Sequence, residues 1–224
     1  MINFIFFFFL ILLFFFIIII LKIFIFFIFN FLVNLIYLSF IFFDNMRPLT
    51  DEETKLVFEK LVKYIGKKIT YMVENEETTF VFRLHRGRVY YCDEKMLKFV
   101  GNFEKKKLIS FGTCLGKFTK TGKFRLNITS LDYLAKYAQY KIWLKPNGEQ
   151  LYLYGHHIIK SHIERISEDT PIHSGVIIYN IKDVPLGFGT TAKSALELKD
   201  TDPNTIVVFN QADVGEYLRV EDDV

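Results

Sequence analysis

The 224-residue chain lacks the short motifs on which most enzyme classes depend. It has two cysteines, Cys92 and Cys114, and no C-x-x-C, H-E-x-x-H or paired zinc spacing. It also has no G-x-G-x-x-G, Walker A or G-x-S-x-G motif, so no dinucleotide, methyl-donor, nucleoside triphosphate or acyl-transfer site is indicated. So few cysteines are typical of a reducing compartment with both thiols free. The sequence therefore predicts a protein without cofactor, metal, small-molecule substrate or catalytic residue.

Residues 1–45 lack glycine, alanine, proline and arginine, whereas Phe, Ile and Leu fill 35 of the 45 positions. Two apolar runs, residues 1–21 and 23–43, are each long enough to span a bilayer at roughly 20 residues per helix. Membrane helices normally contain glycine and alanine, which allow close packing. Codons made of A and T alone can encode nearly every residue of this stretch. We interpret the stretch as a translated AT-rich leader outside the fold, with the true start at Met46. A membrane anchor is the alternative.

The overall net charge of +3 hides an uneven distribution along the chain. Residues 46–139 contain 19 Lys and Arg against 11 Asp and Glu, a net charge of +8. Residues 140–224 contain 8 against 13, a net charge of −5. Since neutralised phosphates supply most nonspecific affinity for nucleic acid, a polyanion is expected to bind the first half.

The first half, residues 46–138, is expected to be an α/β domain with an antiparallel sheet. Thr50 followed by Glu53 is a capping-box signature, and Gly66 is well placed to end the helix predicted over residues 51–65. The other expected elements are strands at 79–85 and 88–92 around a turn at 86–87, a short helix at 93–100, strands at 108–119 and 123–128 around a turn at 121–122, and a helix capped by Ser130 that runs to 137.

The second half, residues 139–219, is expected to be a small β-barrel, because its elements are short and separated by turn signals. A solvated tail at 220–224 follows. The elements expected here are a strand at 141–144, a short helix at 148–154, and strands at 158–160, 175–180, 185–192 and 206–209.

Four basic residues within nine positions form the sharpest charge feature of the sequence. They surround the predicted turn at 121–122 and alternate with two phenylalanines. One interpretation is a basic hairpin that binds an RNA backbone, and the other is a solvated ribbon whose phenylalanines lie in the core. The basic residues are Lys117, Lys120, Lys123 and Arg125, and the phenylalanines are Phe118 and Phe124.

Stretches of the second half resemble the PUA domain, a small RNA-binding β-barrel. Residues 148–166 look like its helix, glycine turn and following strand, and residues 175–189 look like its valine-rich hairpin. Residues 215–219 resemble its closing strand. This resemblance implies RNA contacts at Gly155, His157, Lys160 and Lys193, although the net charge of −5 shifts our expectation towards the basic hairpin.

Residues 46–219 as a whole are similar to the eukaryotic Nip-seven family of large-subunit ribosome biogenesis factors. The motifs that carry the resemblance are those at 46–50, 112–120, 123–126, 131–134 and 141–146. The family implies a monomeric, non-enzymatic factor of the nucleus and nucleolus, with pre-rRNA, the pre-60S particle and its assembly factors as partners. The alternatives are a PUA-containing RNA-modification enzyme or its accessory subunit, or a membrane-anchored protein if residues 1–45 are real.

Overall fold

The computed structural model describes residues 46–73, 80–100 and 110–219. All of them belong to one compact unit that extends from residue 46 to residue 224. The interpretations of residues 1–45 and of the tail at 220–224 lie outside the described residues. Within the described part of the chain, no helix combines the length and the apolar character needed to cross a membrane.

The first long helix, α2 (Asp51–Ile65), confirms the capping signal in the sequence. The Glu53 N–H donates to Thr50 Oγ1 at 3.3 Å, and the Thr50 N–H donates to Glu53 Oε2 at 2.9 Å. Arg47 forms an ion pair with the same carboxylate at 2.7 Å, which fastens the preceding strand to the helix. At the other end Gly66 has a φ of 59°, a backbone conformation that glycine adopts without strain.

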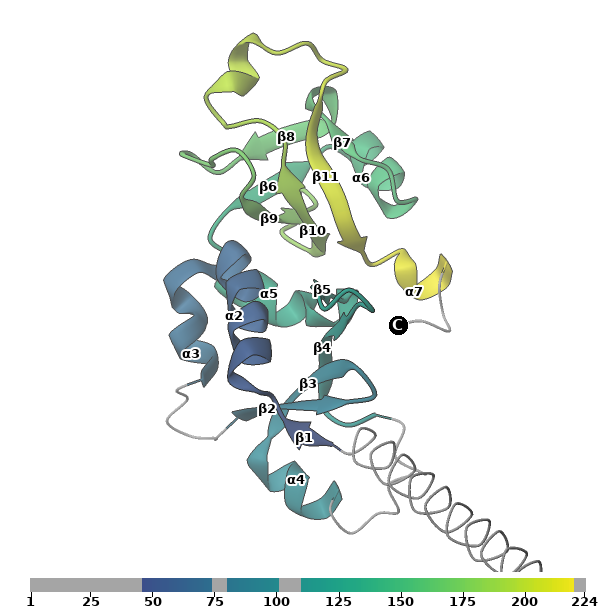
Figure 1. The fold of residues 1–224 in the computed structure, drawn as a ribbon. Helices are drawn as coiled ribbons and strands as arrows, with labels where there is room; N and C mark the ends of the chain where they lie inside the picture. Colours follow the sequence, from purple (N-terminus) through teal and green to yellow (C-terminus); the bar gives the residue numbers. More distant parts are fainter. Residues whose placement is uncertain (1–45, 74–79, 101–109, 220–224) are drawn as a thin grey trace, which may run out of the picture. The chain divides into compact units, whose positions relative to one another are not determined.

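The first sheet is antiparallel throughout and has the strand order β1-β2-β3-β4-β5 (Figure 1). The turn at Arg86 and Gly87 joins two of its strands, and both residues have positive φ, as a tight two-residue hairpin requires. β5 is an edge strand, so no described strand pairs with its outer side. The strands are β1 (Arg47–Pro48), β2 (Phe80–His85), β3 (Arg88–Asp93), β4 (Thr113–Phe118) and β5 (Phe124–Leu126).

Three shorter helices, α3 (Thr70–Val73), α4 (Glu94–Val100) and α5 (Leu131–Tyr137), complete the first half. The prediction that Ser130 caps α5 is wrong. Its hydroxyl donates instead to the Asn127 carbonyl at 2.7 Å, because a 3₁₀ turn leads directly into the helix. The sequence analysis missed α3 and β1, which are too short to show a periodic apolar pattern.

The second sheet has six strands in the order β7-β11-β10-β9-β6-β8. Its two edge strands are separated along the chain by only residues 160–162, so the sheet must curl to bring its edges together. This geometry and the antiparallel first sheet confirm the predicted α+β class with a barrel-like second half. The strands are β6 (Lys141–Leu144), β7 (Ile158–Ile159), β8 (Ile163–Ile166), β9 (Gly175–Tyr179), β10 (Pro185–Thr191) and β11 (Ile206–Asp213).

The end of the second half differs most from the expectation. The predicted closing strand at 215–219 is instead a short helix, α7 (Glu216–Arg219). It follows a turn in which the Gly215 N–H donates to Asp213 Oδ1 at 3.0 Å. β11 is four residues longer than predicted, β8 was not predicted, and helix α6 (Pro146–Leu153) begins two residues early, with proline in its first turn.

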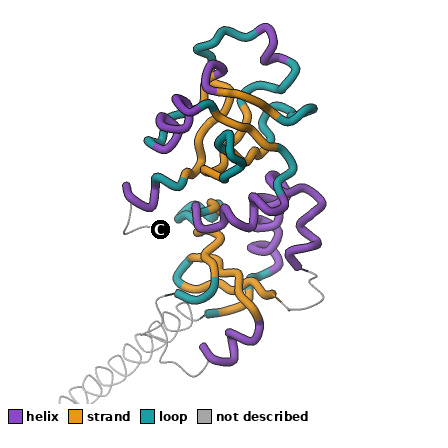
Figure 2. The backbone as a smooth tube through the Cα atoms, turned by 180° about the vertical axis from the view of Figure 1, so that it is seen from behind, coloured by secondary structure: helices purple, strands orange, loops and turns teal. Residues whose placement is uncertain are grey.

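One hydrophobic core joins helices α2 and α5 to strands of both sheets (Figures 1 and 2). The Tyr64 ring meets the Phe188 ring edge-on at 5.3 Å, and the Tyr179 hydroxyl donates to the Ala135 carbonyl at 3.0 Å. Gly175 makes room for Tyr64, since a Cβ there would lie 2.6 Å from the ring. The two halves are therefore packed through α2 and α5 rather than tethered by a linker.

Candidate nucleic-acid interface

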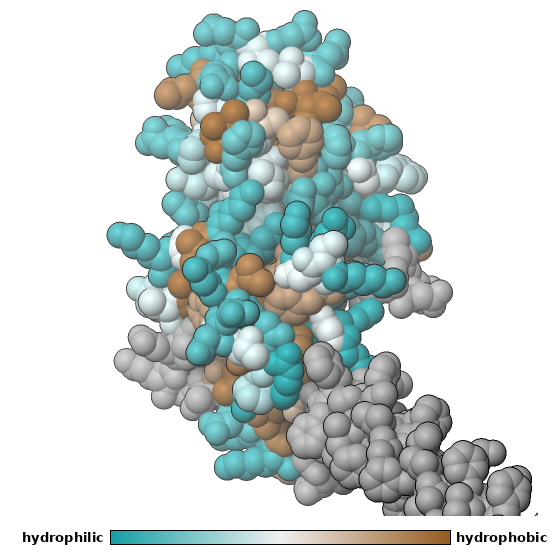
Figure 3. Space-filling view, in the orientation of Figure 1, coloured by the Kyte–Doolittle hydropathy of each residue, from teal (hydrophilic) through white to brown (hydrophobic). Residues whose placement is uncertain are grey.

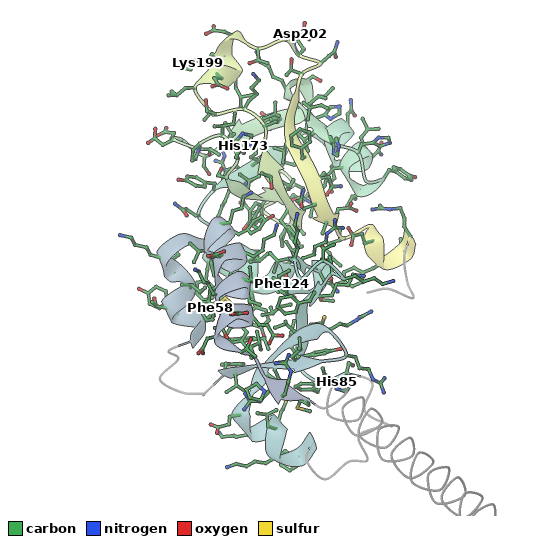
Figure 4. All side chains as sticks on the ribbon, viewed as in Figure 1. Phe58, His85, Phe124, His173, Lys199 and Asp202 are labelled. Carbon is green, nitrogen blue, oxygen red and sulfur yellow. The ribbon has the colours of Figure 1, made fainter. Side chains whose placement is uncertain are left out.

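The basic hairpin forms as expected, with β4 and β5 paired antiparallel. Lys117 lies directly opposite Arg125, and Phe118 lies directly opposite Phe124. Side chains alternate along a strand, so Lys123 and Arg125 share one face while Phe124 points to the other. Phe124 is only 6% exposed, and its ring lies 5.2 Å from that of Phe118, within the core where α2 and β5 meet (Figure 4). The phenylalanines therefore hold the hairpin in shape and do not offer a stacking platform.

Thr119 fixes the turn that presents Lys120 and Lys123. Its N–H donates to the Lys123 carbonyl at 2.8 Å, and the Lys123 N–H donates to Thr119 Oγ1 at 3.1 Å. The Gly122 N–H closes the turn on the Thr119 carbonyl at 2.9 Å, with φ at 75°. Both lysines are exposed, so two cations project from a backbone whose conformation is held by hydrogen bonds.

Three cations stand side by side across the first sheet. Arg88 on β3 lies opposite Lys117, which in turn lies opposite Arg125. This row concentrates positive charge on one part of the first sheet. The sequence analysis missed Arg88, because the β3–β4 register depends on a long-range pairing that leaves no local signal. Burial and the neighbouring charge of Asp213 raise the pKa of Glu216, and the nearby charge of Lys117 opposes this rise to a smaller extent.

A cavity of about 400 Å³ adjoins the hairpin, between α2, β5 and the β10–β11 pair. Lys60, Lys123 and Arg125 line it, and no acidic side chain of the described residues does. Lys60 comes from α2, and its pKa is lowered by burial and, to a smaller extent, by the neighbouring charges of Lys63 and Arg125. The cavity is therefore electropositive, and the protonated form of Lys60 is disfavoured in it.

The two lysines of the second half that the PUA resemblance predicts as RNA contacts are less exposed or more tightly bonded than the hairpin lysines Lys120 and Lys123. The Lys160 ammonium donates to the Lys199 carbonyl at 3.2 Å and also to the Thr201 carbonyl, so it stabilises the end of a 3₁₀ turn. Figure 4 shows Lys199 at the opposite end of the second sheet from Phe124. Lys193 is half-buried after β10. The structure therefore does not bring Lys160 together with the hairpin.

His157 and Gly155 lie in the turn after α6. His157 Nδ1 accepts a hydrogen bond from the Asn210 N–H at 3.3 Å, and its ring meets that of Phe209 edge-on at 5.4 Å. Asn210 also lines the cavity, whereas His157 does not. Gly155 has a φ of 91°, and a Cβ there would lie 3.5 Å from Arg219 Nη2. Gly155 is thus required by the turn, and His157 contacts Asn210, a residue of the cavity wall.

Two cysteines and one histidine of the first half are further candidates for reactive groups. Cys92 and Cys114 are both free thiols, and burial raises the pKa of each. His85 is buried in the first half beside the Tyr90 and Phe111 rings. Across residues 46–73, 80–100 and 110–219, no group of three or more His, Cys, Asp or Glu side chains is placed to hold a metal ion.

Comparison with known proteins matches two segments of the chain to separate family models. A family model described as the NIP7/UPF0113 pre-PUA domain matches residues 46–128, and one described as the UPF0113 PUA domain matches residues 140–222. The 60S ribosome subunit biogenesis protein NIP7 homolog of Xenopus laevis is 59% identical over 177 residues, covering 79% of this chain and 98% of the relative. This chain belongs to the NIP7 family. The Schizosaccharomyces pombe member, 60S ribosome subunit biogenesis protein nip7, is 57% identical over the same coverage.

Solved structures show the same fold at low sequence identity. A PUA domain protein from Aeropyrum pernix, solved as a tartrate complex, aligns with a TM-score of 0.51 at 11% identity, covering 78% of this chain and 88% of that one. A hypothetical protein from Pyrococcus horikoshii aligns with a TM-score of 0.50 at 13% identity, covering 75% and 94%. The resemblance to the NIP7 family and the predicted fold class are both confirmed.

Proposed function

We propose that this chain is a non-catalytic RNA-binding assembly factor for the large ribosomal subunit, needed for pre-rRNA processing. It would act in the nucleolus as a monomer on the pre-60S particle, together with other assembly factors. Its NIP7 relatives are named 60S ribosome subunit biogenesis proteins, which supports this role. A PUA-containing modification enzyme remains the alternative, but no arrangement among the described residues favours it.

The observation that carries the RNA-binding part of the proposal is the concentration of positive charge on β3, β4, β5 and α2. Arg88, Lys117 and Arg125 stand in one row, and Lys60, Lys123 and Arg125 line one cavity. When the lysines and arginines of such a surface neutralise RNA phosphates, the counterions held by the RNA are released into solvent, and this release contributes binding free energy.

The experiment reverses the charge of Lys120 and Lys123 together, by Lys120→Glu and Lys123→Glu. Both side chains are exposed, so the free energy of unfolding should change by no more than about 0.5 kcal/mol per substitution. Affinity for a pre-rRNA transcript should fall, and the slope of log affinity against log salt should flatten by roughly one unit per lost phosphate contact.

The control variant carries Lys182→Glu and Lys193→Glu in the second half, which produces the same change in charge. Lys160 is unsuitable for this control, because its ammonium holds the carbonyls of residues 199 and 201. We expect the control to bind RNA nearly as well as the parent protein. If the control loses RNA binding while the hairpin variant keeps it, the second sheet carries the RNA and the charge argument is wrong.

A further inference from the structure

A β-bulge places two neighbouring amide side chains in the wall of the electropositive cavity. In the β10–β11 ladder Phe188 pairs with Ala212 and Gly189 pairs with Asn210, so Gln211 has no partner. Along a regular strand the side chains of Asn210 and Gln211 would point to opposite faces. The bulge breaks that alternation, and both residues line the cavity. Bulges that redirect a side chain in this way are over-represented next to functional sites.

The other walls of the cavity are mostly aromatic. Tyr64, Phe124, Leu126 and Phe188 form them, and all four are buried. These buried rings close the apolar floor of the cavity and offer no open face for stacking. The cavity joins this floor to two residues with amide side chains, which can both donate and accept, and to cations that line the same space. Its volume of about 400 Å³ lies within the range of roughly 300–1,000 Å³ in which proteins bind small organic groups.

Two buried polar atoms among these lining residues lack a hydrogen-bond partner. Asn210 Nδ2 donates to Asp213 Oδ2 at 2.9 Å, which fixes the amide, but its Oδ1 accepts no bond. Thr190 approaches the Tyr64 hydroxyl, yet the pair does not reach hydrogen-bond geometry, and the hydroxyl has no other partner. A buried polar group without a partner costs on the order of 1–3 kcal/mol, so such groups favour a site that a polar ligand completes.

We propose that this cavity receives one unstacked nucleotide of the bound RNA. The base would enter the cavity with its edge at Gln211 and Asn210, and the adjacent phosphates would meet Lys60, Lys123 and Arg125. RNA-binding proteins commonly read single-stranded bases by hydrogen bonds to the base edge. Continuity with the exposed lysines of the hairpin favours a nucleotide within a strand over a free metabolite. The inference rests on the proposed RNA binding and adds base recognition to it.

The test uses Gln211→Ala in the full chain and a set of short single-stranded RNAs that differ at one position, including an abasic one. Gln211 is exposed and unpaired in the ladder, so its truncation should leave the thermal unfolding temperature unchanged. The parent protein should bind its preferred base about tenfold more tightly than the abasic strand, and the variant should lose most of that difference. The salt dependence of binding should be the same for both, because no phosphate contact is removed.

Gln150→Ala supplies the matched control, since Gln150 is an exposed glutamine on α6 in the second half and does not line the cavity. Base discrimination that survives Gln211→Ala unchanged would overturn the inference. The proposed function would still stand in that case, provided that the Lys120→Glu, Lys123→Glu variant loses affinity for all the RNAs. If that variant binds as the parent does, the proposed function itself fails.

Discussion

At the scale of single residues, the charge of Lys60 lowers the stability of the folded protein and is expected to strengthen anion binding at the candidate site. Its pKa is lowered by burial first and then by Lys63 and Arg125, so its positive charge is less favourable in the folded protein than in the unfolded chain. This cost is present below the lowered pKa and disappears as the pH rises towards the ordinary value of 10.5. An anion in the cavity would stabilise the charge and remove the cost at neutral pH.

We therefore expect Lys60→Met to raise the thermal unfolding temperature at neutral pH in the absence of RNA and to weaken RNA binding. Methionine keeps most of the apolar stem, so the substitution removes charge with little loss of packing. The gain in stability should shrink at alkaline pH, where Lys60 is already neutral. Lys55→Met, an exposed position on the same helix, is the control. A variant at Lys60 that is less stable and binds RNA normally would show that the lysine is structural.

At the scale of secondary-structure elements, Tyr152 of α6 supports the bulge that shapes the cavity. It is fully buried, and its hydroxyl lies 3.0 Å from the Ala212 carbonyl and 3.3 Å from the Phe188 carbonyl, to which it donates. These are the residues paired immediately beside the bulge. Gly187 leaves the space for this contact, because a Cβ there would lie 2.6 Å from the hydroxyl. Helix α6 thus fixes the bulge from the side away from solvent.

Removing this hydroxyl by Tyr152→Phe should lower the free energy of unfolding by about 1–2 kcal/mol, since it leaves buried carbonyls without a donor. Discrimination between the preferred base and the abasic strand should fall, because Gln211 loses its fixed position. The salt dependence of RNA binding should not change. Chemical denaturation and the set of short RNAs check these outcomes. If the variant is destabilised but its base discrimination is unchanged, Tyr152 contributes to stability and does not position Gln211.

Local signals account for the elements that the sequence predicted well. The Thr50–Glu53 capping box, the Arg86–Gly87 turn and the alternating basic hairpin each depend on residues a few positions apart. The features that were missed depend on pairing between distant segments. Neither the position of Arg88 opposite Lys117 nor the bulge at Gln211 leaves a periodic trace in the sequence.

The resemblance to a family helped with the fold and misled on one element of the second half. It suggested a closing strand at 215–219, where Asp213 instead accepts from Gly215 and Arg219 at the start of a helical turn. It also suggested Lys160 as an RNA contact. The Lys160 ammonium donates to backbone carbonyls in the structure, and the RNA contact stays a prediction. Most of the positive charge of the site could be predicted from the sequence, but the cavity and its amides could not.

At the scale of the whole molecule, the shared core makes the two halves interdependent. Val57 and Leu61 of α2 belong to the same cluster as Ile177 and Phe188 of the second sheet. The cavity exists only where α2, β5 and the β10–β11 pair meet. A site built in this way requires both halves to be folded together. Figure 3 shows hydrophilic side chains over most of the face in view, with apolar residues in small groups among them.

A protein that begins at Met46 should accordingly be folded, soluble and monomeric, and it should unfold in a single cooperative transition. Residues 46–138 alone should be much less stable, since they lose the core contacts with Ile177 and Phe188. Calorimetry and light scattering measure both outcomes. Aggregation of the 46–224 protein, together with folding of the full chain in detergent, would mean that residues 1–45 belong to the functional protein.

The central claim is that RNA binds the basic face and the adjoining cavity. The most direct measurement is photo-crosslinking of a pre-rRNA transcript to the full chain, followed by mass spectrometry of the crosslinked peptides. The account predicts crosslinks in peptides that contain Lys60, Lys120 to Arg125, and Asn210 to Gln211. Crosslinks confined to peptides around Lys182 and Lys193, with none on α2 or on the β4–β5 hairpin, would contradict it.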